Sequence, residues 1–240
     1  MGDDVSGTHH AHENEHLDDP HSGVFRASVF GASDGLVSNL ALVMGVAGGS
    51  GDPSVVVLAG IAGLLAGAFS MGAGEYISMQ TQREMLEHEL ALEREHIERY
   101  PKEEEAHLGE LLAESGLDPE DARRVAAQVH RRSEPAVGFH AMFELGIHPG
   151  SMGAPTAAAG WSFFSFAVGA AIPLVPWLVA ADALLATAVI SGLALAVVGG
   201  LATRLTHRSV WFGAARQLLV GALAAGVTYG IGRLVGVAAI

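Results

Sequence analysis

The chain alternates between long apolar stretches and one long polar stretch. Five apolar blocks, each nearly free of charge, are long enough to cross a bilayer as a helix, which needs about 20 residues. The blocks cover residues 24–48, 54–74, 156–177, 183–202 and 210–231. Glycines recur inside them and would let membrane helices approach closely. The pattern therefore predicts an all-α membrane protein with five transmembrane helices.

A polar, acid-rich segment from Glu75 to Glu144 separates the second block from the third. Apolar residues recur at helical spacing in its first part, with no proline or glycine before Pro101, so the second membrane helix is expected to continue out of the bilayer. Helix breakers and caps then predict short helices after Pro101, Asp118 and Pro135, and Gly116 is the expected C-cap of the first of them. The segment is expected to form a helical domain inserted between transmembrane helices 2 and 3.

Two copies of the pattern Glu-x-x-His flank Pro101. Residues three apart share a helix face, so each copy directs two metal-ligand types to one point. Pro101 should end the first helix and start a second one. In a hairpin folded at this turn, Glu93 would face His107, and His96 would face Glu104. These residues form a candidate four-ligand metal site, similar in spacing to di-iron carboxylate bundles; the alternative is a solvated acidic hairpin.

Polar residues also lie within the first two apolar blocks. Asp34 is near the middle of the first block, where a carboxylate normally faces a polar path or a partner. The alternative is that Asp34 caps a helix broken beside Gly35. Near the end of the second block, Met71 shares one helical face with Glu75 and Met79, which follow the block. Thioether and carboxylate ligands suit Fe²⁺ or Mn²⁺, although methionines at such positions also simply pack.

The net charge of −13 is concentrated in the polar segment and in a His-rich stretch over residues 1–23. An acidic surface disfavours nucleic acid and favours cations as partners. The absence of cysteine excludes thiolate metal sites. Oxygen and imidazole ligands suit Fe²⁺, Mn²⁺ or Zn²⁺, and several carboxylates favour the first two. Residues 1–23 are expected to be disordered and either collect metal or only aid solubility.

Basic residues indicate the topology. They flank the first block and occur in the polar insert and in the loop between the fourth and fifth blocks, but not in the two other short loops. This distribution predicts a cytoplasmic N-terminus and insert, with the C-terminus outside. Five spans leave no internal two-fold repeat, so a symmetric pore would need a homodimer. The expected domains are 1–23, tail; 24–80, membrane helices 1–2; 81–150, cytoplasmic helical metal-binding insert; and 151–240, membrane helices 3–5.

Three segments resemble the vacuolar iron transporter family: Gly-Ala-Ser-Asp-Gly-Leu at 31–36, Ser-Met-Gly-Ala-Gly-Glu-Tyr at 70–76, and Phe-Glu-Leu-Gly at 143–146. The order of elements also fits, and the likeness covers about residues 24–236. The resemblance implies a dimeric five-helix protein of a lipid bilayer, here expected to be the cell (inner) membrane, that exchanges Fe²⁺ and often Mn²⁺ for protons. It implies a secondary transporter and not an enzyme.

The resemblance also suggests roles for particular residues. Asp34 and Met71 would bind the ion in a pathway at the dimer interface. Well-studied members use glutamates at five insert positions, which correspond in this chain to Glu93, His96, Glu104, His107 and Glu144. Glu75, His140 and Met142 are further candidates. His140 and Glu144 lie four residues apart and are expected on the surface of the short helix that follows Pro135. Because two of the five positions are histidine, Zn²⁺ or Co²⁺ binding stays open.

The leading hypothesis is an exporter of Fe²⁺ or Mn²⁺ from the cytoplasm that works by proton antiport. One alternative is a membrane-tethered di-iron oxidase with carboxylate and histidine ligands. Another is a metal-binding sensor or scaffold that does not transport, which would leave the intramembrane Asp34 unexplained.

Overall fold

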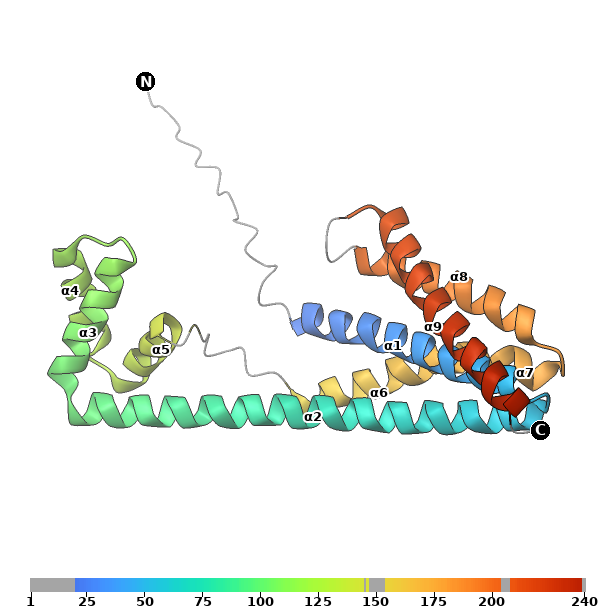
Figure 1. The fold of residues 1–240 in the computed structure, drawn as a ribbon. Helices are drawn as coiled ribbons and strands as arrows, with labels where there is room; N and C mark the ends of the chain where they lie inside the picture. The colour runs from blue at the N-terminus through green and yellow to red at the C-terminus, as the bar shows by residue number, and fades with distance from the viewer. Residues whose placement is uncertain (1–19, 145, 147–153, 204–207, 239–240) are drawn as a thin grey trace, which may run out of the picture. The chain divides into compact units, whose positions relative to one another are not determined.

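The computed structural model describes residues 20–144, 146, 154–203 and 208–238, and the elements found in them are all helical (Figure 1). The expected tail falls outside the described residues up to residue 19, and the first helix begins at Pro20. The helices are α1 (Pro20–Gly49), α2 (Pro53–Arg99), α3 (Pro101–Glu114), α4 (Pro119–Val129), α5 (Ser133–Glu144), α6 (Pro155–Ala171), the 3₁₀ turn η1 (Ile172–Leu174), α7 (Val175–Val179), α8 (Leu184–Ala202) and α9 (Val210–Ala238).

Five helices in the described part of the chain are long and apolar enough to cross a membrane, which confirms the predicted number of spans. The third span combines α6, η1 and α7. Pro173 and Pro176 lie in its far part, where the helix tightens into the 3₁₀ turn, as expected for prolines that cannot donate a backbone hydrogen bond.

The helix α2 has 47 residues and continues without interruption from its apolar first half into its charged second half. At 1.5 Å per residue it is about 70 Å long. The chain forms two compact units: residues 1–76 with 156–240, and residues 77–155. The first unit contains the apolar spans, and the second contains the charged end of α2 with α3, α4 and α5.

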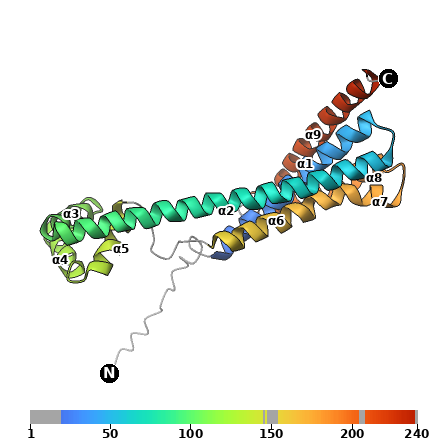
Figure 2. The ribbon, with the colours of Figure 1, turned by 90° about the horizontal axis from the view of Figure 1, so that it is seen from below.

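In the first unit, α1 packs against both α8 and α9 (Figure 2). Leu36 and Leu40 of α1 share a buried cluster with Leu195 of α8 and Ala225 of α9. Close backbone approach requires small residues here, because a Cβ atom added to Gly232 would collide with the backbone of α1. Tight packing of this kind holds α1, and with it the intramembrane carboxylate, at a defined position.

In the second unit, three short helices fold onto the charged end of α2. Leu108, Leu112, Ala122 and Ala126 form one buried cluster between α3 and α4. A second cluster, of Ile97, Ala136 and Val137, joins α2 to α5.

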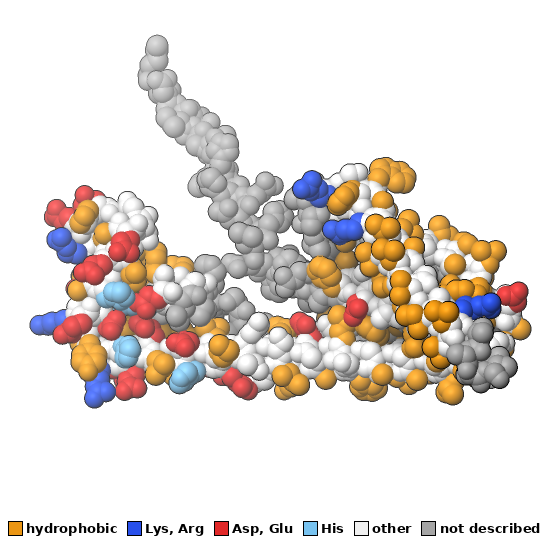
Figure 3. Space-filling view, viewed as in Figure 1, with side chains coloured by type: hydrophobic (Ala, Val, Ile, Leu, Met, Phe, Trp, Pro, Cys, Tyr) orange, Lys and Arg blue, Asp and Glu red, His pale blue; other side chains and the backbone are white. Residues whose placement is uncertain are grey.

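The helix boundaries follow local sequence signals. Asp118 caps α4 by accepting a hydrogen bond from the Glu120 amide at 2.9 Å. Gly116 has φ of 105° and ends α3, as the expected C-cap glycine does. Side chains of the second unit are strongly acidic, in contrast to the apolar surface of the first (Figure 3).

Candidate metal centre

Four metal-ligand side chains of the second unit converge on one point. Glu93 of α2, Glu104 of α3, and His140 and Glu144 of α5 each offer a ligand atom, and these atoms all lie within 4.8 Å of one another. His140 Nδ1 is 2.7 Å from Glu144 Oε1, 3.1 Å from Glu93 Oε1 and 4.0 Å from Glu104 Oε2. His107 Nε2 lies beside the group, 3.2 Å from Glu144 Oε1.

The imidazole at the centre of the group is fully buried. The sequence interpretation placed His140 on the surface of its helix, and this was wrong. His140 lies on the same face of α5 as Ala136 and Val137, which pack against Ile97 of α2. The apolar stripe of α5 therefore turns His140 inward, against the carboxylates of α2 and α3.

Three carboxylates compete for one imidazole nitrogen. The hydrogen bond of Nδ1 goes to Glu144, because one N–H group serves one acceptor well. Glu93 Oε1 lies 3.1 Å from the same His140 nitrogen. It is buried and accepts no hydrogen bond from a described residue. Burial raises the pKa of Glu93, the neighbouring Glu144 and Glu104 raise it further, and the two nearby histidines, His140 and His96, partly offset the effect. A divalent cation would relieve this repulsion.

The raised pKa has a consequence for stability. A carboxyl group whose pKa is higher in the folded state contributes stability below its usual pKa, and this contribution is lost as the pH rises through the folded-state pKa. At pH 7 in chelator, Glu93→Gln in the full-length detergent-solubilised protein should therefore raise the melting temperature, because glutamine places no charge beside Glu104 and Glu144.

The matched control for that measurement is Glu98→Gln, which alters an exposed residue of the same helix. The difference in melting temperature between Glu93→Gln and the wild type should shrink as the pH falls toward the usual pKa of a glutamate. A melting temperature that is unchanged or lower at pH 7 would contradict the electrostatic account.

The convergence differs from the hairpin expected from sequence. Glu93 and Glu104 meet around His140 of α5, whereas His96 is exposed and is not in the group of described ligand atoms. The cause lies in α2, where Leu90 and Ile97 pack toward α5. His96 directly precedes Ile97 in sequence and so projects about 100° away from it around the helix.

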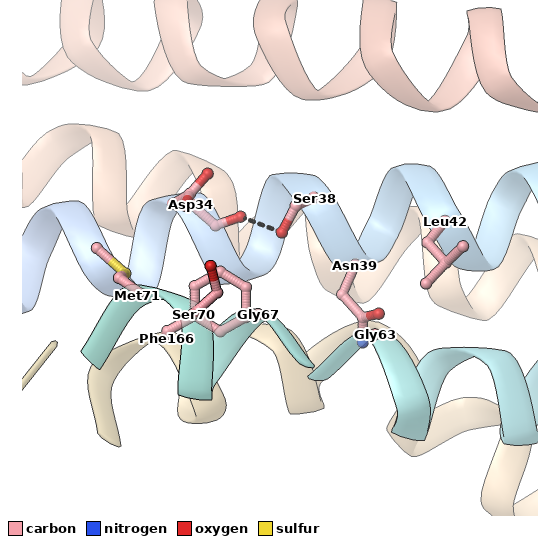
Figure 4. Close-up of a pocket in the computed structure, with 9 residues that line it drawn as sticks. All are labelled: Asp34, Ser38, Asn39, Leu42, Gly63, Gly67, Ser70, Met71 and Phe166. Atoms are coloured by element: carbon pink, nitrogen blue, oxygen red, sulfur yellow. Dashed lines mark hydrogen bonds between the residues drawn. The ribbon is translucent and has the colours of Figure 1, made fainter. Parts of the chain in front are cut away.

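The predicted intramembrane residues meet in the first unit. Asp34 of α1 and Met71 of α2 line one cavity of about 380 Å³ (Figure 4). The other lining residues are Ser38, Asn39, Leu42, Gly63, Gly67, Ser70 and Phe166. The helix α1 runs unbroken through Asp34 and Gly35, so the alternative of a capped, broken helix is wrong.

The polar atoms of this cavity include acceptors without donors. Ser38 donates a hydrogen bond to the backbone carbonyl of Asp34 at 2.6 Å, and no described residue forms a hydrogen bond or ion pair with the Asp34 carboxylate (Figure 4). The Asn39 amide donates to the Ala170 carbonyl at 2.6 Å, which leaves its buried Oδ1 without a donor among the described residues. Acceptor atoms that lack a hydrogen-bond donor favour the binding of a cation in this cavity.

The two remaining candidate ligands, Glu75 and Met142, lie on different helices. Glu75 lies one turn beyond Met71 on α2, and Met142 is partly buried on α5; neither belongs to the ligand group of the described residues. His130, which sequence reasoning did not consider, follows α4, and its ring centroid is 5.3 Å from that of His140. Its sequence signal was its position near the end of one expected short helix and before the next.

The five apolar helices define the chain as a multi-pass membrane protein, and the acceptor-lined cavity and the Glu and His cluster suit a cation. A family model described as the VIT family matches residues 25–233, and the chain belongs to this family. This confirms the resemblance noted from sequence motifs, and it identifies a transporter rather than an enzyme.

Curated relatives align over nearly the whole chain. "Vacuolar iron transporter 1" of Oryza sativa subsp. japonica is 31% identical over 235 residues, which are 96% of this chain and 92% of the relative. "Vacuolar iron transporter 1" of Eucalyptus grandis is 29% identical, covering 98% of each chain. "Vacuolar iron transporter" of Acanthamoeba castellanii is 35% identical, covering 89% of this chain and 79% of the relative.

Proposed function

We propose that the chain exports Fe²⁺, and also Mn²⁺, from the cytoplasm by exchange for protons. The observation that carries the proposal is the intramembrane cavity in which the unpaired Asp34 carboxylate lies with Met71. The names of the relatives support iron as the cargo. Manganese rests on ligand chemistry, because carboxylate and carbonyl oxygens suit both ions.

The Asp34 carboxylate provides the coupling. An ionised carboxylate at membrane depth is costly unless a cation or a proton neutralises it. Asp34 would therefore hold either the metal or a proton, and alternation between the two states would exchange one for the other. Asn39 Oδ1 and the Met71 thioether offer further ligands in the same cavity. The mixed oxygen and sulfur set favours a borderline transition metal over Mg²⁺ or Ca²⁺.

The direction of transport rests on the distribution of positive charge. Arg204 and Arg208 occur between α8 and α9, while residues 50–52 and 180–183 contain no basic residue. The insert contains eight basic residues, which are Arg83, Arg94, Arg99, Lys102, Arg123, Arg124, Arg131 and Arg132. The positive-inside rule then supports a cytoplasmic N-terminus and insert. Because the chain has no cysteine, single introduced cysteines and an impermeant thiol reagent would test this topology directly.

In this arrangement residues 81–150 are the collector that takes metal from the cytoplasm. The three carboxylates and one imidazole around His140 would hold Fe²⁺ or Mn²⁺, and the histidines also admit Zn²⁺. The membrane is expected to be the cell (inner) membrane, whereas the relatives are named for the vacuole. The oxidase and sensor alternatives lose their support because the chain belongs to a transporter family.

A homodimer would complete the pathway. In one chain the Asp34 side chain is exposed, although it lies in a membrane-spanning helix. A second copy would cover this side of α1 and supply the opposite wall. Light scattering of the detergent-solubilised protein should give twice the mass of one chain, and a monomer would contradict this part of the proposal.

The experiment that tests the function is Fe²⁺ uptake into proteoliposomes under an imposed pH gradient. An antiporter moves metal into the acidic compartment, so vesicles that are acidic inside should take up Fe²⁺ faster than vesicles without a gradient, and a protonophore should abolish the difference. Equal rates would contradict proton coupling. Failure to move Fe²⁺, Mn²⁺ or Zn²⁺ under any gradient would refute transport itself.

A further inference from the structure

A second imidazole lies against the buried histidine of the candidate metal centre. His130 follows α4 as its C-terminal cap, and its ring meets that of His140 edge to face, with ring centroids 5.3 Å apart. His130 Nδ1 is 3.2 Å from the Ala126 carbonyl oxygen. His130 Nε2 is buried and has no hydrogen-bond partner among the described residues.

The contacts determine which nitrogen of His130 carries the proton. A carbonyl oxygen only accepts hydrogen bonds, so Nδ1 must be the N–H donor toward Ala126. In the neutral ring Nε2 is then an unprotonated lone pair. This lone pair is buried with neither solvent nor a described donor to satisfy it.

The buried His140 has the same arrangement. Its Nδ1 lies 2.7 Å from Glu144 Oε1 and donates to that carboxylate. Its Nε2 is buried without a partner among the described residues, and the whole side chain is inaccessible to solvent. Two adjacent imidazoles thus each present a desolvated lone pair, which is costly without a partner.

An N–H group bound to a carbonyl or carboxylate oxygen is also how proteins orient histidines that ligate metals. His130 has the carbonyl form of this support and His140 has the carboxylate form. We propose that His130 and His140 form a second metal position, in which both bind one divalent ion through Nε2. Glu144 then orients His140 and is not itself a ligand of this ion.

The donor set predicts which ions use this position. Imidazole nitrogen suits Zn²⁺ and Co²⁺, whereas Mn²⁺ prefers oxygen ligands. The carboxylates of Glu93 and Glu104 would hold Mn²⁺ or Fe²⁺, and the histidine pair would hold Zn²⁺ or Co²⁺. His140 cannot offer both nitrogens as neutral lone pairs, so the two positions compete for it. The inference rests on the proposed role of the insert as a metal collector and adds a nitrogen-based selectivity to it.

The test compares Zn²⁺ and Mn²⁺ binding to the full-length detergent-solubilised protein by calorimetry after removal of metal with chelator. His130→Ala should weaken binding of the tightest Zn²⁺ ion by roughly 10–100-fold and leave Mn²⁺ affinity unchanged. Glu104→Gln should weaken Mn²⁺ binding more than Zn²⁺ binding. His88→Ala, at an exposed position on α2, is the matched histidine control and should change neither.

If His130→Ala loses Zn²⁺ and Mn²⁺ affinity equally, or loses neither, the proposed metal position at His130 and His140 is overturned. Should that variant fail to fold, ¹⁵N NMR of the wild-type protein with one equivalent of Zn²⁺ decides the matter. Two buried histidines should then be protonated at Nδ1 and bound at Nε2, and absence of such a pair would overturn the inference. Unchanged Mn²⁺ affinity in Glu104→Gln would count instead against the collector, whatever the histidines do.

Discussion

Asp34→Asn should reduce Fe²⁺ uptake into proteoliposomes to the leak of protein-free vesicles. The asparagine keeps the size of the side chain but removes the charge that neutralises a divalent ion at membrane depth. It also removes the group that would take the returning proton. The cavity around Asp34 and Met71 should keep its shape, because the carboxylate makes no hydrogen bond or ion pair with a described residue.

The control for this experiment is Asp182→Asn, which makes the same chemical change in the loop between α7 and α8. Its transport rate should match the wild type. Metal binding by the insert, measured on the same Asp34→Asn preparation, should also match the wild type because Asp34 lies in the other compact unit. Wild-type transport in Asp34→Asn would refute the pathway assignment.

The double variant Glu104→Gln with Glu144→Gln should weaken Mn²⁺ and Fe²⁺ binding to the full-length protein by at least 10–100-fold, a loss typical of changes around metal ligands. Both oxygens lie within 4.8 Å of the other ligand atoms, so the variant removes two of the three negative charges at that point. Calorimetry at pH 7 measures the effect. Transport at saturating metal should persist, because the membrane cavity is unchanged.

The matched control is Glu103→Gln with Glu110→Gln, which removes two exposed charges from α3, the helix of Glu104, and spares the cluster. It should bind Mn²⁺ like the wild type. A similar loss in both double variants would indicate a diffuse effect of acidic charge, in contradiction to a defined site. Binding in the wild type should also weaken at acidic pH, since protons compete for the same carboxylates and imidazoles.

Local sequence signals were sufficient for much of the fold. The apolar blocks predict five spans because backbone groups in a bilayer must be satisfied within helices, and the structure contains five helices of the required length. Gly116 and Asp118 act as expected, because helix caps depend on neighbouring residues alone.

The candidate metal centre required more than local signals. Glu93, Glu104 and Glu144 were predicted ligands and do converge, but the pairing across one hairpin was not found. The sequence of α2 and α3 alone does not show that α5 brings His140 between Glu93 and Glu104. Burial of Ile97 against Ala136 brings α5 onto α2, places His140 at the centre and leaves His96 in solvent.

By itself, the sequence determined the number of membrane helices, the acidic insert between the second and third, and the residue types able to bind a cation. These features depend on hydropathy, spacing and charge, which are properties of neighbouring residues. The tertiary structure decided which side chains meet: Asp34 with Met71 across two helices, and Glu93 with Glu104 around His140. It also brought His130 to His140, because their contact comes from the packing of helices and not from a pattern in the chain.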